Sequence, residues 1–139
     1  MSDRNILDLD PELQSLCQQF LDQCHAQNIN VFLTETYRSS EDQDADYASG
    51  RTAPGHIITN AKGGQSPHNC TLEDGTPSSK AFDFGIKDGN GDLDWNAQDP
   101  AWQTAIAIGE SLGLVSGSTW HSIKDFPHFQ LSSFSASNT

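Results

Sequence analysis

The stretch "AFDFGI", residues 81–86, decides the fold, because it has the composition of a buried strand. Apolar and aromatic residues favour strands, and here they surround a single charged side chain, Asp83. The segment "DGNGD", residues 88–92, follows it and is typical of a turn. We therefore expect a strand here, with Asp83 as a candidate functional group.

Two helices and one strand are expected upstream of this strand. Asp10 resembles an N-cap followed by proline, and an apolar stripe at three and four spacing continues the helix to about Gln27. The stretch "NVFLTETYR", residues 30–38, is rich in β-branched and aromatic residues and predicts a strand. Ser40, with Gln43 three residues later, resembles a capping box that opens a short helix.

A long loop, one more helix and a last strand complete the expected order. Residues 50–79 show no sustained period, and loops of that length in compact domains are usually functional or disordered. Asp99 again precedes a proline and begins a helix that Gly113 stops. "HFQL", residues 128–131, predicts a strand, and a polar tail starts at about residue 132. This order predicts an α+β fold, a small antiparallel sheet flanked by helices with long active-site loops.

Length and charge limit the possible partners. The 139 residues fit one domain, 1–139, with no room for a cell-wall-binding domain. Seven Lys plus Arg against nineteen Asp plus Glu give a net charge of −12, which argues against nucleic acid and anionic membranes as partners. The three cysteines form no CxxC pair, so free thiols are expected. We expect a monomer.

The hydropathy pattern indicates no membrane insertion and no secretory signal. No apolar run approaches the roughly 20 residues of a transmembrane helix. The first residues, "MSDRNILDLD", lack the apolar core of a signal peptide. We therefore expect synthesis in the cytoplasm.

Histidines and carboxylates supply candidates for a metal site. A catalytic zinc ion takes three protein ligands from His and carboxylate and keeps one position open for water. His68 in the long loop, Asp83 in its strand and His128 at the start of the last strand meet that requirement. Asp125 is the candidate general base. Two alternatives remain open: the histidines can be surface or core residues, and Asp83 a structural hydrogen-bond acceptor.

The spacing of Asp125 and His128 constrains the geometry of the last strand. Residues three apart on a regular strand point to opposite faces, so the two could not both face one ion from it. Pro127 is confined to strand edges, strand starts or bulges. We therefore expect Asp125 on a turn and His128 as the first paired residue.

Three short motifs carry a resemblance to a known family. They are Ser-x-His at 66–68, Ala-x-Asp at 81–83 and Asp-x-x-His at 125–128, with "GRTAPG" and "TNAKGG" upstream. Over residues 31–131 the chain resembles the peptidoglycan zinc peptidases of the D-Ala-D-Ala carboxypeptidase and dipeptidase group. It is most similar to bacteriophage L-alanyl-D-glutamate endopeptidase endolysins.

The resemblance implies a role for each motif residue. The implied zinc ligands and general base are His68, Asp83, His128 and Asp125. Arg38 in "YRS" would stabilise the developing oxyanion. The alternative for Arg38 is a surface salt bridge with Glu41 or Asp42. Ser66 would position the loop or the substrate, because no base lies beside it in the sequence.

One departure from the family concerns the spacing of the first two ligands. The family usually has its aspartate seven residues after the first histidine, whereas Asp83 follows His68 by fifteen. The intervening "NCTLEDGTPSSK" indicates an insertion, and Glu73 and Asp74 in it are competing carboxylates. Asp83 is preferred because Phe82 and the other apolar neighbours reproduce the family's strand context.

The turn after residue 87 offers a possible calcium site. Asp88, Asn90, Asp92 and Asp94 alternate as in the first part of an EF-hand loop. The glycine at the sixth position and the glutamate at the twelfth are missing. A solvated hairpin turn is the alternative.

The sequence therefore predicts a zinc peptidase that cuts a peptidoglycan stem-peptide amide, L-Ala/D-Glu by resemblance, during phage lysis of the host cell. The relatives imply that a separate pore-former releases such an enzyme through the inner membrane to the cell wall. The alternatives are a D-Ala-D-Ala carboxypeptidase and a zinc-containing binding domain without catalysis.

Overall fold

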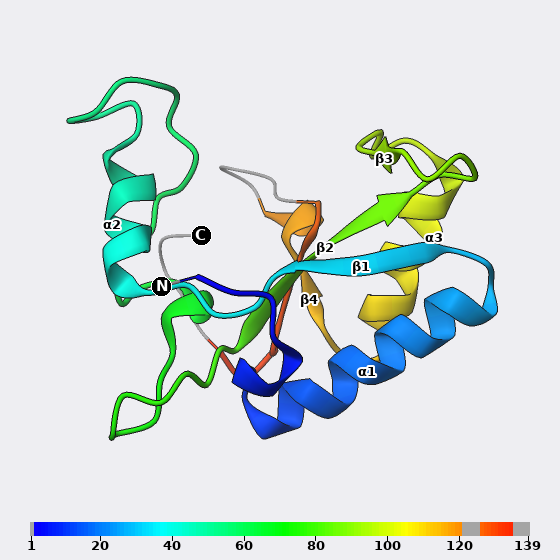
Figure 1. Cartoon of the computed structure of the whole chain (residues 1–139), viewed down its shortest axis with the longest axis horizontal. Helices are drawn as coiled ribbons and strands as arrows, with labels where there is room; N and C mark the ends of the chain where they lie inside the picture. The colour runs from blue at the N-terminus through cyan, green and yellow to red at the C-terminus, as the bar shows by residue number, and fades with distance from the viewer. Residues whose placement is uncertain (1, 121–125, 135–139) are drawn as a thin grey trace.

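The computed structural model describes residues 2–120 and 126–134 and has an α+β fold, as expected (Figure 1). Three α-helices are present in the described residues: α1 Pro11–Ala26, α2 Ser40–Ala48 and α3 Pro100–Ser111. The strands are β1 Asn30–Glu35, β2 Ala81–Lys87, β3 Leu93–Asp94, β4 Val115–Ser116 and β5 His128–Gln130. Short 3-10 turns are η1 Ile6–Asp8, η2 Pro67–Asn69 and η3 Gly117–Thr119.

The strands form one antiparallel sheet in the order β1-β2-β5-β4, with β3 pairing β2 beyond its β5 segment. Strand β2 is the centre, because it pairs with three other strands. Its first residues lie beside β5, with Asp83 opposite His128. The predicted strand at residues 81–86 is therefore confirmed and lies inside the sheet.

An aromatic cluster fills one side of β2. Phe82 and Phe84 are fully buried, and the ring of Phe20 from α1 lies 5.7 Å and 5.0 Å from theirs. Helices α1 and α3 lie side by side on this side of the sheet (Figure 1). On α3, a Cβ at Gly109 would come within 2.2 Å of the Phe129 ring, so the helix can approach β5 only with glycine there. The core thus fixes β2 and β5 against each other.

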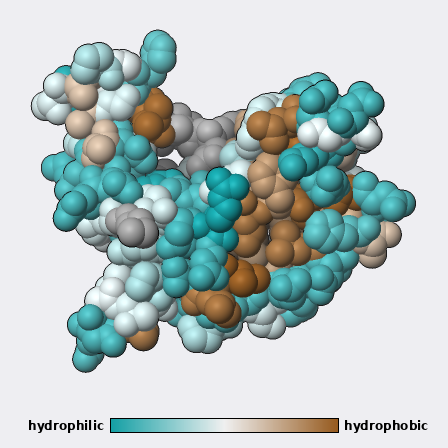
Figure 2. Space-filling view, in the orientation of Figure 1, coloured by the Kyte–Doolittle hydropathy of each residue, from teal (hydrophilic) through white to brown (hydrophobic). Residues whose placement is uncertain are grey.

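Helix α2 lies at the other end of the molecule, together with the long loop that follows it (Figure 1). Its N-cap is Ser39, whose side chain accepts from the Asp42 amide, so the expected capping box at Ser40 is wrong. Gln43 is fully buried and bonds elsewhere. Figure 2 shows mostly hydrophilic residues around α2. The apolar residues on this face lie mainly over the region of β1, α1 and α3.

The first strand is shorter than predicted, ending at Glu35 rather than near Arg38. Its register with β2 shifts between Leu33 and Glu35. Thr36 then leaves the ladder and bonds to the N-terminal segment, through its amide to the Asp3 carbonyl at 2.7 Å. The two-residue strands β3 and β4 were not predicted, because two residues carry no periodic signal.

The helix boundaries otherwise agree with the sequence. Asp10 and Asp99 accept from the amides two residues on, as N-caps should. Gly113 follows α3 with φ 91°, the left-handed conformation that ends helices. Within the described ranges no helix has the length and apolarity needed to cross a membrane.

Candidate metal centre

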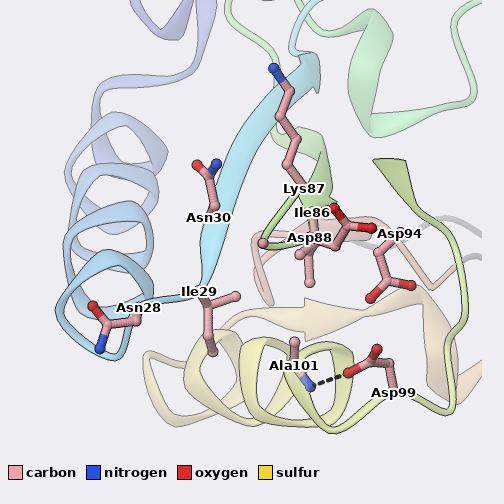
Figure 3. Close-up of a pocket in the computed structure, with 10 residues that line it drawn as sticks. Asn28, Ile29, Asn30, Ile86, Lys87, Asp88, Asp94, Asp99 and Ala101 are labelled. Carbon is pink, nitrogen blue, oxygen red and sulfur yellow. Dashed lines mark hydrogen bonds between the residues drawn. The ribbon is translucent and has the colours of Figure 1, made fainter. Parts of the chain in front are cut away.

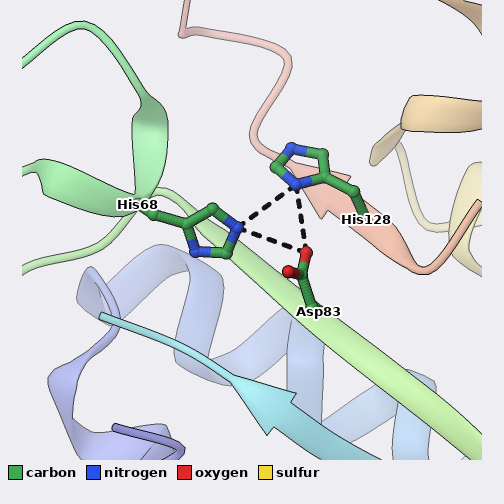
Figure 4. A group of neighbouring side chains, drawn as sticks. All are labelled: His68, Asp83 and His128. Atoms are coloured by element: carbon green, nitrogen blue, oxygen red, sulfur yellow. Dashed lines mark hydrogen bonds and ion pairs between the residues drawn. The ribbon is translucent and has the colours of Figure 1, made fainter. Parts of the chain in front are cut away.

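Three side chains from distant parts of the chain meet beside the sheet: His68 of η2, Asp83 of β2 and His128 of β5 (Figure 4). His68 Nε2 lies 3.2 Å from both Asp83 Oδ1 and His128 Nδ1, and His128 Nδ1 lies 3.1 Å from Asp83 Oδ1. Of the residues the structure describes, these alone form a group of three or more His, Cys, Asp or Glu able to hold a metal ion.

The His68 backbone is fixed by a hydrogen-bonded turn. Ser66 caps η2, its hydroxyl accepting from the His68 amide at 3.2 Å, and a capping box with Asn69 completes the cap. The His68 carbonyl accepts from the Arg38 amide at 3.0 Å. His68 is 2% exposed. Ser66 therefore positions the loop, and its expected role toward substrate stays a prediction.

The sheet register positions the other two residues. Asp83 and His128 are direct partners across the antiparallel β2–β5 pair, so their side chains share one face. Pro127 precedes β5, and His128 is the first residue of that strand, as expected. Asp125, expected on a turn before it, lies outside the described residues.

The outer hydrogen bonds show which ring nitrogens face inward as acceptors. His68 Nδ1 lies 2.8 Å from the Thr36 carbonyl, which can only accept, so Nδ1 carries the proton and Nε2 a lone pair. His128 Nε2 lies 2.9 Å from Gln130 Oε1 and donates to it, which leaves a lone pair on Nδ1. Two imidazole lone pairs and a carboxylate oxygen therefore converge.

Such a set of acceptors requires a positive charge between its members. Two neutral imidazoles and one carboxylate, each imidazole anchored by its other nitrogen, match the donor set of a catalytic zinc site. Among the residues that the structure describes, three ligands converge, which leaves the fourth position of a tetrahedral ion without a ligand from them. The residues present therefore fit zinc.

The charge on Asp83 suits a ligand role. Burial alone would raise its pKa, but when the inward nitrogens of His68 and His128 bind a proton in place of a metal ion, the charge of His68 and the hydrogen bonds of both imidazoles outweigh burial. The pKa of Asp83 is therefore lowered below its ordinary value. The carboxylate is ionised at neutral pH, as a metal ligand must be.

Arg38 lies next to this group. Its Nη2 is 3.8 Å from Asp83 Oδ2, while its Nε donates to Glu35 at 3.0 Å and its Nη1 to Gln43 at 2.8 Å. Burial would lower the pKa of Arg38, but the hydrogen bond and charge of Glu35 raise it. The structure thus holds a cation beside the three residues. It pairs with Glu35, rather than with the Glu41 or Asp42 of the alternative interpretation.

Sequence reasoning missed Glu35, Thr36 and Gln43 as parts of this region. Gln43 is fully buried, accepts from Arg38 and donates to the Ala61 carbonyl at 2.9 Å, so it joins α2, Arg38 and the long loop. Gln43 follows Ser40 by three residues, and this spacing led to the prediction of a capping box instead. The signal for Glu35 was its position three residues before Arg38, close enough for an ion pair.

The insertion between His68 and Asp83 folds back on itself. Thr71 bridges Pro77 in a small hairpin, and the Lys80 amide then donates to the Pro67 carbonyl at 2.9 Å. The chain thus returns to η2 before entering β2, which makes the spacing of fifteen compatible with a common site. Glu73 and Asp74 lie exposed in the hairpin, outside the metal-binding group.

Two of the four predicted calcium residues, Asp88 and Asp94, line a separate pocket of about 250 Å³ between β1, β2 and α3 (Figure 3). Asp88 Oδ1 accepts from the amides of Asn90 and Asp92, as in a hydrogen-bonded turn. Asp94 Oδ1 accepts from the Asn96 amide, and Asp99 Oδ1 from the Ala101 amide. These contacts fit the hairpin-turn alternative, and the calcium hypothesis stays a prediction.

Comparison with known proteins shows what the chain is similar to. No family model matches the chain. Over 110 residues it is 34% identical to the peptidoglycan L-alanyl-D-glutamate endopeptidase CwlK of Bacillus subtilis, covering 74% of this chain and 61% of the relative. The chain thus spans about three fifths of the length of that relative.

A solved structure has a fold similar to that of this chain. The L-Ala D-Glu endopeptidase ChiX of Serratia marcescens superposes with a TM-score of 0.60 at 17% identity, over 95% of this chain and 89% of the other. These findings bear out the resemblance inferred from the motifs: the chain is similar in sequence to part of one L-alanyl-D-glutamate endopeptidase and similar in fold to another.

Proposed function

We propose that this chain is a zinc-dependent peptidase that hydrolyses the L-Ala/D-Glu amide of the peptidoglycan stem peptide. The observation that carries the proposal is the convergence of His68, Asp83 and His128 with inward-facing acceptors. The activity for which both relatives are named supplies the substrate class.

The residues divide the chemistry among them. His68, Asp83 and His128 hold the ion, which when bound would polarise the scissile carbonyl and lower the pKa of water toward 7. Arg38, a fixed cation 3.8 Å from Asp83, balances negative charge developing on the carbonyl oxygen, worth on the order of 3 kcal/mol. Asp125, assigned from the sequence, takes the water's proton and passes it to the leaving amine.

A catalytic role is favoured over a purely structural zinc. Structural zinc sites are closed by four protein ligands, whereas the described residues offer three. Arg38 is 17% exposed and held by Glu35 and Gln43, and a structural ion has no use for a cation beside it.

We further propose that the protein is a bacteriophage endolysin, monomeric, released through the inner membrane by a separate pore-former and acting on the cell wall. The support is the motif resemblance to phage endolysins. Both relatives named above come from bacteria, so this setting rests on the motifs alone.

Mass spectrometry of fragments from purified peptidoglycan tests the bond. The expected product has a new L-Ala carboxyl terminus and a freed D-Glu amino group. Free D-Ala would identify the carboxypeptidase alternative instead. A zinc-loaded protein that releases neither would be a binding domain. Chelator treatment should abolish the release, and zinc should restore it.

Two matched histidine variants separate the site from general effects. His68→Ala should lose zinc in elemental analysis together with activity. His56→Ala, which changes an exposed histidine outside the group, should keep both. Stoichiometric zinc in His68→Ala would exclude that residue as a ligand.

The proposed base has its own test. Asp125→Ala should retain zinc and lose about 10²- to 10⁴-fold in hydrolysis, the range for a general base. Wall-degrading activity within about threefold of wild type would remove Asp125 from that role.

A further inference from the structure

The N-terminal segment reaches the metal centre through one buried residue, Thr36. Thr36 is fully buried just after β1, and its carbonyl oxygen lies 2.8 Å from His68 Nδ1. This hydrogen bond leaves Nε2 of His68 as the inward-facing acceptor. The position of one backbone carbonyl therefore controls how His68 faces Asp83.

Hydrogen bonds to residues 3 and 5 hold Thr36 and its neighbour Tyr37. The Thr36 amide donates to the Asp3 carbonyl at 2.7 Å, and the Asp3 amide donates to the Tyr37 carbonyl at 3.0 Å. The Thr36 hydroxyl lies 2.8 Å from Asp3 Oδ1 and 2.9 Å from the Asn5 carbonyl. The peptide group before Thr36 and the one after Tyr37 are thus restrained by Asp3, and the Thr36 carbonyl lies between them.

The same N-terminal segment also binds the residues that precede β2, the strand that carries Asp83. Leu9 bridges Ser79 in parallel, with the Ser79 amide donating to Asp8 at 2.9 Å and the Asp10 amide to Ser79 at 2.8 Å. Ser79 lies two residues before β2 begins. We call residues 3–10 the N-terminal brace, because they bind the segments next to two of the three metal-site residues.

We propose that the N-terminal brace is a positioning element of the metal centre, which fixes the tautomer and the direction of His68 through Thr36. The inference rests on the proposed zinc-binding function. An imidazole fixed by a hydrogen bond from its other nitrogen is already oriented as a ligand, and loss of such an outer partner lowers metal affinity about 10- to 100-fold. Thr36 acts one step further out, by holding the carbonyl that accepts.

The test uses Thr36→Val, which keeps the size of the side chain and removes the hydroxyl. The zinc dissociation constant, measured against a chromophoric chelator, should rise about tenfold. In the metal-free protein, the ¹⁵N shifts of the His68 ring should lose the pattern of a proton fixed on Nδ1. Thr36→Ser restores the hydroxyl and should restore both readouts.

A destabilised control separates positioning from stability. Ile108→Val removes a buried methylene on α3, in the aromatic core rather than beside the site. It should lower the melting temperature of the metal-free protein and leave zinc affinity and the His68 ring shifts unchanged. Should Thr36→Val not fold, Asp3→Ala replaces it, because that change removes a single carboxylate acceptor of the hydroxyl.

The outcomes distinguish the two proposals. If wild type binds zinc, and Thr36→Val binds it with equal affinity and shows unchanged His68 ring shifts, the proposal that the N-terminal brace positions His68 is overturned. Absence of zinc binding by wild type would instead overturn the metal centre, while the His68 ring shifts of the metal-free variants would still decide whether Thr36 sets the tautomer. Equal losses of zinc affinity in Ile108→Val and Thr36→Val would also overturn the brace.

Discussion

The two faces of β2 obey different physical rules. On one face, Phe84 lies parallel to Phe129 at 5.4 Å and beside Trp102 at 5.0 Å, within the core covered by α1 and α3. On the other face, Asp83 meets His68 and His128 at 3.1–3.2 Å. One strand thus carries core residues and a candidate metal ligand on alternate residues.

The two faces of β2 differ in how many contacts stabilise each side chain. Phe20 touches three aromatic rings, so the apolar face is redundant and its attraction does not depend on the angle of any one contact. The polar face depends on single acceptor atoms at fixed distances. Changes on the first face should therefore lower the free energy of unfolding, and changes on the second should lower zinc affinity.

The largest effect is expected on the apolar face. Phe84→Ala should lower the free energy of unfolding by about 3–5 kcal/mol, because it empties a fully buried ring position. Urea denaturation of the metal-free protein measures this. Zinc affinity of the folded fraction should stay the same. The unfolded fraction of the variant lowers the apparent zinc affinity by a calculable amount. A larger loss than this would show that the two faces are coupled.

Next comes the polar face of the same strand. Asp83→Asn keeps the shape of the side chain and removes its charge, so zinc affinity should fall by at least about 100-fold, beyond the loss of an outer partner. The dissociation constant against a competing chelator measures it. The free energy of unfolding without metal should change less than in Phe84→Ala. Zinc binding at wild-type affinity would exclude Asp83 as a ligand.

Local signals predicted the apolar half of the fold. Asp10 and Asp99 each precede a proline, and both cap helices as the sequence indicates. The apolar and aromatic residues around Asp83 predicted a strand that contains a single charged side chain. Each of these signals is contained within a few residues, so no knowledge of distant segments was needed.

The polar half depended on contacts that the local pattern does not contain. The motifs named His68, Asp83 and His128, but their meeting requires the β2–β5 register and the closure of Lys80 onto Pro67. Glu35 and Gln43 acquire their roles only where Arg38 is folded against them. Long-range convergence is therefore what the sequence alone could not supply.

A smaller effect is expected beside Asp83 on the polar face. A Cβ at Gly85 would lie 2.7 Å from the Phe32 ring, so Gly85→Ala forces that ring to shift and should lower the free energy of unfolding by about 1 kcal/mol. Gly89→Ala is the matched control, since nothing lies within 4 Å of its added carbon. Equal melting temperatures for the two variants would contradict the crowding, and zinc affinity should be unchanged in both.

The smallest effect is expected at the tip of the inserted hairpin. Glu73→Gln with Asp74→Asn removes both carboxylates that compete with Asp83 for the ligand role by sequence. Both side chains are exposed, and the chain closes at Pro67 and Lys80 behind them, so neither zinc affinity nor melting temperature should change. The hydrogen bond from the Thr76 amide to the side chain of residue 74 is retained, because the Oδ1 atom of asparagine also accepts. If zinc affinity fell as far as in Asp83→Asn, the hairpin rather than β2 would supply the carboxylate, and the division of β2 into a core face and a metal face would be wrong.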